Sequence, residues 1–281
     1  MDRIGFVGTG TITEAVVSGL CTLAEPPARI TVSPRNASRA ESLSQRFAQV
    51  TVAPDNQAVL DASDVVCIAV GPGIANDVLK ALNFREDHIV VSFVSTISIA
   101  GIRELIAPAR HVCRMVPLPP VADHLGPITL YPPDKKIAAL FGGIGTMTEI
   151  DTEEQLYALW TVTAMMAPYF GFLQQMSAWL EARNIEPQLA QRYVGSMLHA
   201  LSVTGKQVGD GGFEQLIVEH STPRGLNEQA LRELNGAGWD ALVCKALDLI
   251  EDRLNGRADF ESRLRQSPSP APSRTKAIRN E

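Results

Sequence analysis

Short apolar runs alternate with amphipathic stretches along the first half of the chain. Each apolar run is a few residues long and is bounded by turn residues, which is typical of a buried parallel strand. The stretches between the runs carry apolar residues at helical spacing, and several begin at a Ser, Asp or Asn that can cap a helix. The pattern predicts strands at 4–7, 29–33, 50–52, 64–70, 88–94 and 110–116, and helices at 11–22, 38–49, 56–62, 74–82 and 98–106.

Six strands that alternate with helices indicate an α/β fold with a doubly wound, mostly parallel sheet of the Rossmann type. A cluster of prolines at 117–120 interrupts the alternation. Two further short runs, 128–131 and 146–150, predict strands at the edge of the sheet, with a helix at 135–141 between them. We therefore assign residues 1–150 to a first, Rossmann-type domain.

The pattern of apolar and polar residues changes after residue 151, where strand-like runs stop. Long amphipathic stretches predict helices at 153–179 (kinked at Pro168), 187–208, 213–219 and 227–254. Residues 151–256 therefore form an all-α second domain. The remaining segment, 257–281, is polar and rich in Pro and Ser. Such a segment lacks the apolar residues needed for a core, so we expect a disordered tail.

A glycine-rich turn connects the first predicted strand to the first predicted helix. The first glycine permits a tight turn, and the second lets the backbone approach a pyrophosphate lying on the helix N-terminus. Thr13 stands at the third position of the motif, where a small residue is preferred. The residues expected to contact a dinucleotide here are Gly8, Thr9, Gly10, Thr11 and Ile12.

The end of the second strand distinguishes NAD from NADP. An acidic residue there would bind the ribose 2′-hydroxyl, but no Asp or Glu occurs from Ser33 up to Glu41. Arg35 can instead pair with a 2′-phosphate, with Ser33 and Asn36 as neutral donors. This arrangement favours NADP(H) over NAD(H). The alternative is that Arg35 is only a solvated loop charge.

The end of the fourth strand contributes the other side of the expected cofactor site. Ala69, Val70 and Gly71 lie at the carboxyl edge of the sheet, where residues usually flank the nicotinamide half of a dinucleotide. A plain turn explains the same residues.

Composition and charge narrow the classes of partner. The chain has 281 residues, 45% of them hydrophobic, and a formal net charge of −6, which argues against nucleic acid and anionic membranes as partners. No run of about 18 uninterrupted apolar residues and no secretory leader are recognised, so a cytoplasmic protein without a membrane span is expected. The four cysteines are scattered, with no pair or nearby His recognised at metal-ligand spacing, so no metal site is expected.

Several of these segments resemble pyrroline-5-carboxylate reductases, the enzymes of the last step of proline synthesis. The segment 4–20 is similar to the family's opening, 33–36 to its NADP-selecting loop, and 114–117 to the stretch that closes its sixth strand. Residues 222–239 resemble the substrate loop and the helix that follows it. The resemblance implies NADPH-dependent reduction of a C=N bond in a small imino acid, and a homodimer formed through the helical domain.

The chain departs from the family's pattern at several positions. Gly71 stands where the family usually has Lys, and Leu118-Pro119 replaces an Asn-Thr pair. A Gly-Ser-Gly-Pro element is replaced by residues 164–167. In the substrate loop, Arg224 replaces a glycine and Asn227 takes the place of a Thr that contacts the imine. The resemblance therefore implies a reductase architecture more firmly than proline synthesis.

The loop at 221–228 is the candidate substrate site. Backbone N–H groups where its helix begins can hold a carboxylate, Arg224 can add a bidentate salt bridge, and Thr222 and Asn227 supply polar side chains. The alternatives are that Arg224 points to solvent and that Asn227 merely caps the helix.

Reduction of a protonated imine needs orientation more than a strong acid, which fits a chain without an obvious acid–base pair. Reduction of a keto acid requires a proton donor, usually Lys, Tyr or His, and the predicted helix 153–179 contains no Lys. We therefore favour an imine reductase. A carbonyl reductase acting on keto or hydroxy acids and a catalytically weak NADP-binding scaffold or sensor are kept as alternatives.

Overall fold

The computed structural model describes residues 3–257, and contacts between residues divide the chain into two compact units. Among the described residues, unit 1 comprises 3–157 together with 251–257, and unit 2 comprises Ala158–Ile250. Unit 2 is thus inserted into unit 1, and the boundary falls inside two helices. The predicted domain boundaries at residues 150 and 256 stay a prediction. Apart from Arg257, the predicted tail at 257–281 lies outside the residues that the structure describes.

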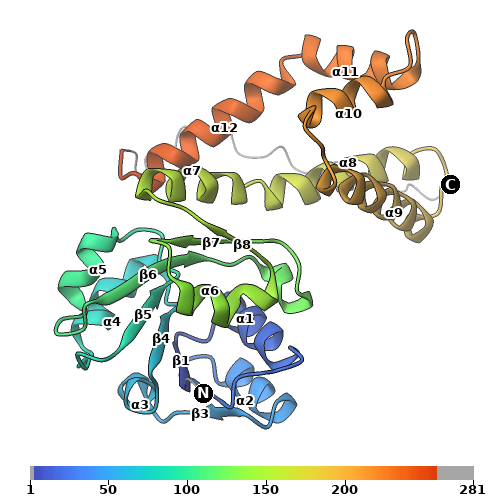
Figure 1. Ribbon diagram of the computed structural model, residues 1–281. Helices are drawn as coiled ribbons and strands as arrows, with labels where there is room; N and C mark the ends of the chain where they lie inside the picture. Colours follow the sequence, from blue (N-terminus) through green and yellow to red (C-terminus); the bar gives the residue numbers. More distant parts are fainter. Residues whose placement is uncertain (1–2, 258–281) are drawn as a thin grey trace, which may run out of the picture. The chain divides into compact units, whose positions relative to one another are not determined.

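Unit 1 is built around a sheet that has eight strands within the described residues, in the order β3-β2-β1-β4-β5-β6-β7-β8. All neighbouring strands run parallel except β6 and β7, which are antiparallel. The predicted Rossmann-type fold with two added edge strands is confirmed (Figure 1). The strands are β1 (Arg3–Val7), β2 (Arg29–Val32), β3 (Val50–Val52), β4 (Val65–Ile68), β5 (Ile89–Ser92), β6 (His111–Val116), β7 (Pro127–Tyr131) and β8 (Thr146–Glu149).

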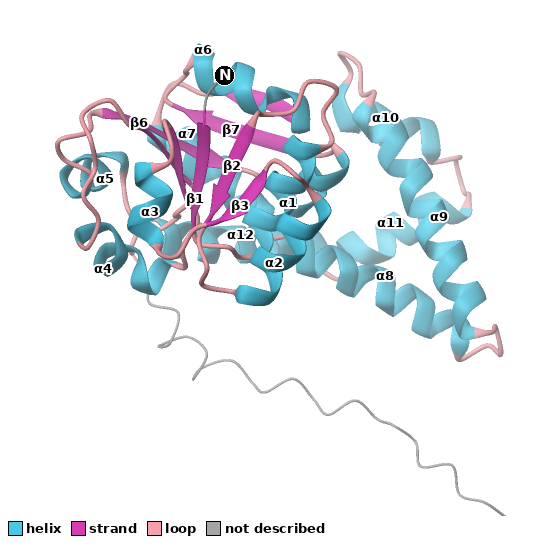
Figure 2. Cartoon of the chain, turned by 90° about the horizontal axis from the view of Figure 1, so that it is seen from below, coloured by secondary structure: helices cyan, strands magenta, loops and turns pink. Residues whose placement is uncertain are grey.

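Helices cover both faces of the sheet, as Figure 2 shows. Helices α1, α2 and α6 pack on one face around Phe6, Leu20 and Phe141, and helices α3, α4 and α5 pack on the other around Ile68, Leu79 and Ile102. These side chains are buried, which explains why β1, β4 and β5 in the centre of the sheet are almost entirely apolar. The helices are α1 (Thr11–Cys21), α2 (Ala37–Arg46), α3 (Asn56–Asp61), α4 (Ala75–Lys80), α5 (Ile99–Leu105) and α6 (Lys135–Phe141).

The starts of several helices follow from side-chain caps that the sequence contains. The Asp55 carboxylate accepts from the Ala58 N–H at the start of α3, and the Ser98 hydroxyl accepts from the Gly101 N–H at the start of α5. Asp134 caps α6 in the same way. Each cap satisfies an N–H group that the helix itself leaves unpaired.

Unit 2 is helical, but two of the long helices predicted there are each divided. The helix predicted at 153–179 is broken at Ala164–Met165, and Pro168 lies in the first turn of the second half, where its missing N–H costs nothing. The helix predicted at 227–254 is broken before Gly238, whose φ of 79° ends the first half. The observed helices are α7 (Glu153–Thr163), α8 (Met166–Glu181), α9 (Pro187–Lys206), α10 (Gly212–His220), α11 (Leu226–Gly236) and α12 (Trp239–Leu254).

One helical stretch is long and apolar enough to cross a membrane by length and composition alone. It runs over α7 and α8, from Glu153 to Glu181. Its most apolar 18 residues have a mean hydropathy of 1.3, and 11% of them are buried. The sequence-based expectation of no spanning segment overlooked this stretch, because polar residues interrupt its apolar run. In the single chain this stretch leaves large apolar side chains exposed, among them Phe170 and Trp179.

Candidate functional site

The glycine turn between β1 and α1 has the geometry that a dinucleotide-binding turn requires. Gly8 has a φ of 100°, and a Cβ placed on it would lie 2.5 Å from the carbonyl oxygen of Ala69. Only glycine fits this contact with the end of β4. Gly10 differs, because nothing lies within 4 Å of the position that its Cβ would take. The backbone at Gly10 is therefore open to a ligand at the N-terminus of α1.

Buried hydroxyl groups hold the turn in place. The Gly8 N–H donates to Ser33 Oγ at 2.9 Å, and Thr9 Oγ1 donates to the Ser33 carbonyl at 2.6 Å. Ser33 is fully buried. In this structure the enclosed Ser33 side chain supports the turn, and its predicted contact with a cofactor phosphate stays a prediction. Thr13 is also buried, and its hydroxyl donates to the Gly8 carbonyl at 2.6 Å, which explains why a Thr suits the third motif position.

A cleft of about 400 Å³ lies over the glycine turn in unit 1. It brings together eight of the predicted cofactor residues, from the ends of β1, β2 and β4. Thr11 and Ile12 are not part of its lining: Thr11 is exposed, and Ile12 packs against the core. Gly73 and Ile74 also line the cleft and were not predicted. The lining residues are Gly8, Thr9, Gly10, Arg35, Asn36, Ala69, Val70, Gly71, Gly73 and Ile74.

Charge in and around the cleft suits an anion. The cleft lining contains one arginine, Arg35, and no acidic residue within the described part of the chain. Glu14 lies in the first turn of α1, but Arg39 forms an ion pair with it at 3.5 Å. Arg39 also donates to the Thr11 hydroxyl at 2.7 Å, so it joins α2 to the N-terminus of α1. Sequence reasoning missed Arg39, which lies in the first turn of α2, four residues after Arg35.

A buried arginine, Arg114, lies beside the carboxyl end of β5 and forms a cluster with Glu153 and Tyr157. Arg114 on β6 is fully buried, donates to the carbonyl groups of Val94 and Ser95, and forms an ion pair with Glu153. Its guanidinium lies 4.9 Å from the centre of the Tyr157 ring. Glu153 also accepts from the Ile99 N–H at 2.8 Å. The cluster therefore ties the start of α7 to the sheet, which is a structural role.

The loop before α11 contains Thr222 and Arg224, and the first turn of α11 contains Asn227, so the three predicted catalytic residues follow one another in unit 2. Arg224 adopts a left-handed conformation with a φ of 61°, which glycine adopts without strain. Its backbone N–H donates to the Glu228 carboxylate. Asn227 Nδ2 donates to the His220 carbonyl at 2.8 Å, so this side chain caps the C-terminus of α10. The Thr222 carbonyl accepts from the Gly225 N–H at 2.7 Å, which closes the turn.

Similarity to other proteins agrees with this geometry. A family model described as NADP oxidoreductase, coenzyme F420-dependent, matches residues 3–96. Pyrroline-5-carboxylate reductase of Pseudomonas aeruginosa is 27% identical over 266 residues, covering 89% of this chain and 95% of that protein.

Two solved structures share the fold over nearly their whole length. The pyrroline-5-carboxylate reductase of Streptococcus pyogenes has a TM-score of 0.79 at 19% identity, covering 91% of this chain and 98% of the other. The Plasmodium falciparum pyrroline carboxylate reductase, solved with NADP bound, has a TM-score of 0.78 at 15% identity, covering 92% and 98%.

The fold, the glycine turn and these matches define an NAD(P)H-dependent oxidoreductase of the Rossmann class that acts on carbon–nitrogen bonds. Within that class, the chain is similar to pyrroline-5-carboxylate reductases over most of its length, at 27–28% identity to three of them. The resemblance stated from the sequence is thereby confirmed.

Proposed function

We propose that this protein is an NADPH-dependent imine reductase that transfers a hydride to the C=N bond of a small imino acid. The observation that carries the proposal is the cleft in unit 1, where an open glycine backbone, a helix N-terminus and Arg35 converge. The family relationship supports the same reaction class.

The residues of the cleft fit NADP(H). A pyrophosphate can approach Gly10 because no atom occupies the space beside its Cα, and the N–H groups that begin α1 point to that space. Arg35 and Asn36 lie on the side of the cleft where β2 ends, as a 2′-phosphate site requires. The lack of an acidic side chain in the described lining removes the group that would select NAD and repel the phosphate.

The chain's own residues have to bind and orient, because the bound cofactor supplies the hydride. In this proposal, Ala69, Val70 and Gly71 flank the nicotinamide half, and the loop at 221–228 holds the substrate carboxylate. Arg224 has a left-handed backbone, which glycine adopts without strain, and it adds a cationic side chain to the loop. An acidic substrate gains a charge-assisted partner from this change.

Arg35 supplies the test of the cofactor. We expect Arg35→Ala to raise the Kd for NADPH at least about tenfold and to leave the Kd for NADH unchanged, since only the 2′-phosphate contact is lost. Arg29→Ala is the matched control, because Arg29 is an exposed arginine at the opposite end of the same strand. Equal loss of both dinucleotides, or no loss at all, contradicts the proposed 2′-phosphate site.

A substrate panel tests the reaction. Wild-type protein is mixed with NADPH and with imino acids or keto acids of the same size, and oxidation of NADPH is followed by absorbance. Rapid turnover with imino acids alone is expected. Turnover with keto acids alone indicates a carbonyl reductase, and tight NADPH binding without any turnover indicates a scaffold or sensor; either result overturns the proposal.

Arg224 is tested by restoring the family's residue. Arg224→Gly removes the cation and relieves the left-handed strain, so we expect an unchanged or higher Tm together with a KM more than about tenfold higher for an acidic substrate. Arg224→Lys keeps the charge and should recover part of the affinity. An unchanged KM in Arg224→Gly would show that this side chain does not bind substrate.

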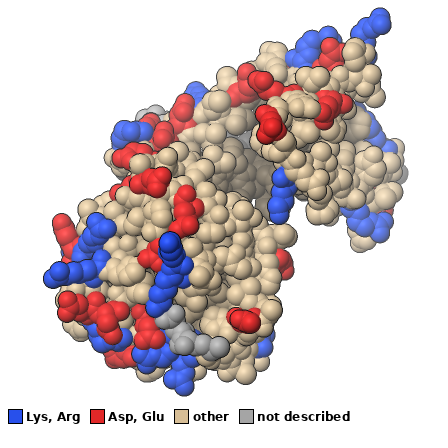
Figure 3. Space-filling view, in the orientation of Figure 1, with Lys and Arg blue, Asp and Glu red and all other residues tan. Residues whose placement is uncertain are grey.

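We also propose that unit 2 forms a homodimer. Large apolar side chains are exposed along its helices, and much of the surface over α8 and α9 seen in Figure 3 carries no charged residue. Burial against a second copy removes this surface from water. The most exposed aromatic examples are Phe170 at 65%, Tyr193 at 65% and Phe213 at 66%.

Light scattering during size-exclusion chromatography tests the dimer. We expect wild-type protein to elute at twice the chain mass, Phe170→Glu to shift toward the monomer, and Leu125→Glu, an exposed leucine of unit 1, to stay dimeric. A monomeric wild-type protein refutes the proposal.

A further inference from the structure

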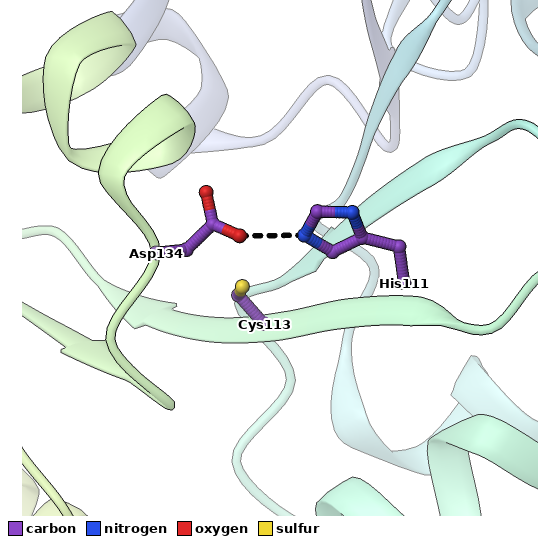
Figure 4. A group of neighbouring side chains, drawn as sticks. All are labelled: His111, Cys113 and Asp134. Carbon is purple, nitrogen blue, oxygen red and sulfur yellow. Dashed lines mark hydrogen bonds and ion pairs between the residues drawn. The ribbon is translucent and has the colours of Figure 1, made fainter.

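Three side chains with metal-binding atoms meet at the amino-terminal end of β6. His111 and Cys113 are the first and third residues of this strand, so their side chains point to the same side of the sheet. The antiparallel register pairs Arg114 with Tyr131, and continuing it brings position 134 level with position 111. The ligand atoms of His111, Cys113 and Asp134 all lie within 4.8 Å of one another. Figure 4 shows the imidazole and the carboxylate facing each other beside the sulfur.

We propose that His111 Nε2, Cys113 Sγ and Asp134 Oδ2 form a binding site for a divalent transition-metal ion, with Zn²⁺ as the ion that suits these donors best. One sulfur, one nitrogen and one oxygen are typical Zn²⁺ ligands, whereas Mg²⁺ and Ca²⁺ prefer oxygen atoms only. Three protein ligands leave a fourth tetrahedral position for water.

The surroundings of the three groups favour an ion. Asp134 Oδ1 accepts from the Ile137 N–H at the start of α6, which fixes the carboxylate and leaves Oδ2 directed at His111. Fixing a ligand by its second atom is what neighbouring hydrogen bonds do at metal sites. The Asp134 N–H in turn donates to Glu149 at 3.1 Å.

Burial changes in steps across the site. The His111 side chain is 45% exposed and that of Asp134 is 16% exposed, while Cys113 is buried at 1%. An ion can therefore enter past the imidazole and meet the sulfur at the inner end. A thiolate, a carboxylate and a neutral imidazole together carry two negative charges, which a divalent ion cancels.

Binding requires a small rearrangement that the structure permits. His111 Nε2 and Asp134 Oδ2 are 2.6 Å apart, at hydrogen-bond distance. Two such ligands on a tetrahedral Zn²⁺ lie about 3.3 Å apart, given metal–ligand bonds of about 2.0–2.1 Å. The exposed imidazole can move outward by this difference. The Cys113 thiol releases its proton to solvent as its sulfur binds the ion.

The site lies at the opposite end of the parallel strands from the cofactor cleft. Strand β6 is parallel to β5, β4 and β1, so its first residue lies at the amino ends of these strands, whereas the cleft lies at their carboxyl ends. The ion would join β6 to the start of α6. Its expected effect is on stability, independent of NADPH and of the proposed reaction.

Titration of the full-length protein with Co²⁺ and with Zn²⁺ tests the proposal. The exposed Cys244 is first replaced in Cys244→Ser to remove an adventitious thiol. On this background we expect one ion per chain, a near-ultraviolet thiolate-to-Co²⁺ absorption band that Zn²⁺ abolishes, and a Tm increase of about 5–10 °C at a hundredfold excess over Kd.

Variants separate the site from a simple His–Asp ion pair. His111→Ala changes an exposed side chain and should keep the fold, yet lower the Zn²⁺ affinity at least about tenfold; Cys113→Ser should abolish the thiolate band. His199→Ala is the control, since His199 is an exposed histidine of unit 2. Unchanged Zn²⁺ affinity in His111→Ala, or no stoichiometric binding by the parent, overturns the proposal. NADPH affinity measured alongside should be equal in all variants.

Discussion

The two glycines of the turn after β1 should respond in opposite ways to the same substitution. Gly10→Ala places a methyl group in open space over the cleft, whereas Gly8→Ala forces a methyl group to 2.5 Å from the Ala69 carbonyl oxygen at a φ of 100°. The first change should impair binding without unfolding the protein. The second should impair folding itself.

The magnitudes follow from the local geometry. At Gly10, the N-cap of α1, alanine is less favourable than glycine by about 0.5–1 kcal/mol, and reduced freedom of the unfolded chain offsets about 0.4–1 kcal/mol, so the net change in stability is near zero. At Gly8, the left-handed conformation and the overlap together cost about 2–5 kcal/mol. A methyl group between Gly10 and a pyrophosphate should raise the Kd for NADPH at least about tenfold, or about 1.4 kcal/mol.

Two assays on the same preparations separate these effects. Urea unfolding followed by circular dichroism gives the free energy of unfolding, and NADPH fluorescence titration gives the Kd. We expect Gly10→Ala to unfold at the wild-type urea midpoint and to bind NADPH weakly. If Gly10→Ala binds NADPH as tightly as the wild type does, the dinucleotide does not cross this turn and the proposed cofactor site is refuted.

Other positions give further tests. Burial lowers the pKa of His88 in the folded protein, so the wild type should lose stability as the pH falls through about 6.5, the ordinary value that applies in the unfolded chain. His88→Gln should lose less stability, measured as the urea midpoint, between pH 7.5 and 5.5. Equal pH dependence in the two proteins would contradict this prediction. Glu153→Ala leaves the Arg114 guanidinium buried without its carboxylate and should cost about 3 kcal/mol, part of which Arg114→Met recovers in the double variant; additive losses in thermal melts would argue against coupling. Gly5→Ala places a Cβ 2.2 Å from Ser63 Oγ and should cost about 1–3 kcal/mol, and Ser63→Ala should relieve part of this loss; wild-type stability in Gly5→Ala would refute this close approach of β1 to Ser63.

The alternation of strands and helices in unit 1 was predictable because the central buried strands are mostly apolar on both faces and several helices begin at a cap such as Asp55 or Ser98. The divisions in unit 2 were harder to predict. Pro168 fits a helix start as well as a kink, and Gly238 ends α11 inside a stretch whose apolar spacing continues into α12. Local propensity there does not show which of two permitted conformations the packing selects.

The candidate site was predictable where a motif fixes the backbone and unpredictable where a side chain's direction decides its role. Gly8 and Gly10 were found because a glycine turn has a recognisable spacing. Ser33 occupies the expected position but points inward, and only its burial shows that it supports the turn. His111 and Cys113 were overlooked as a pair, because their spacing of two becomes meaningful only on a strand, and Asp134 joins them through the register of β7.

The insertion of unit 2 between Tyr157 and Glu251 affects how the protein is made and how it can be cut. During synthesis Glu251 and the residues after it follow all of unit 2, so unit 1 acquires this segment only after unit 2 has been translated. A protease that cleaves once within unit 2 leaves both pieces joined to unit 1. Release of unit 2 requires two cuts, one in α7 and one in α12, where the chain passes between the two units.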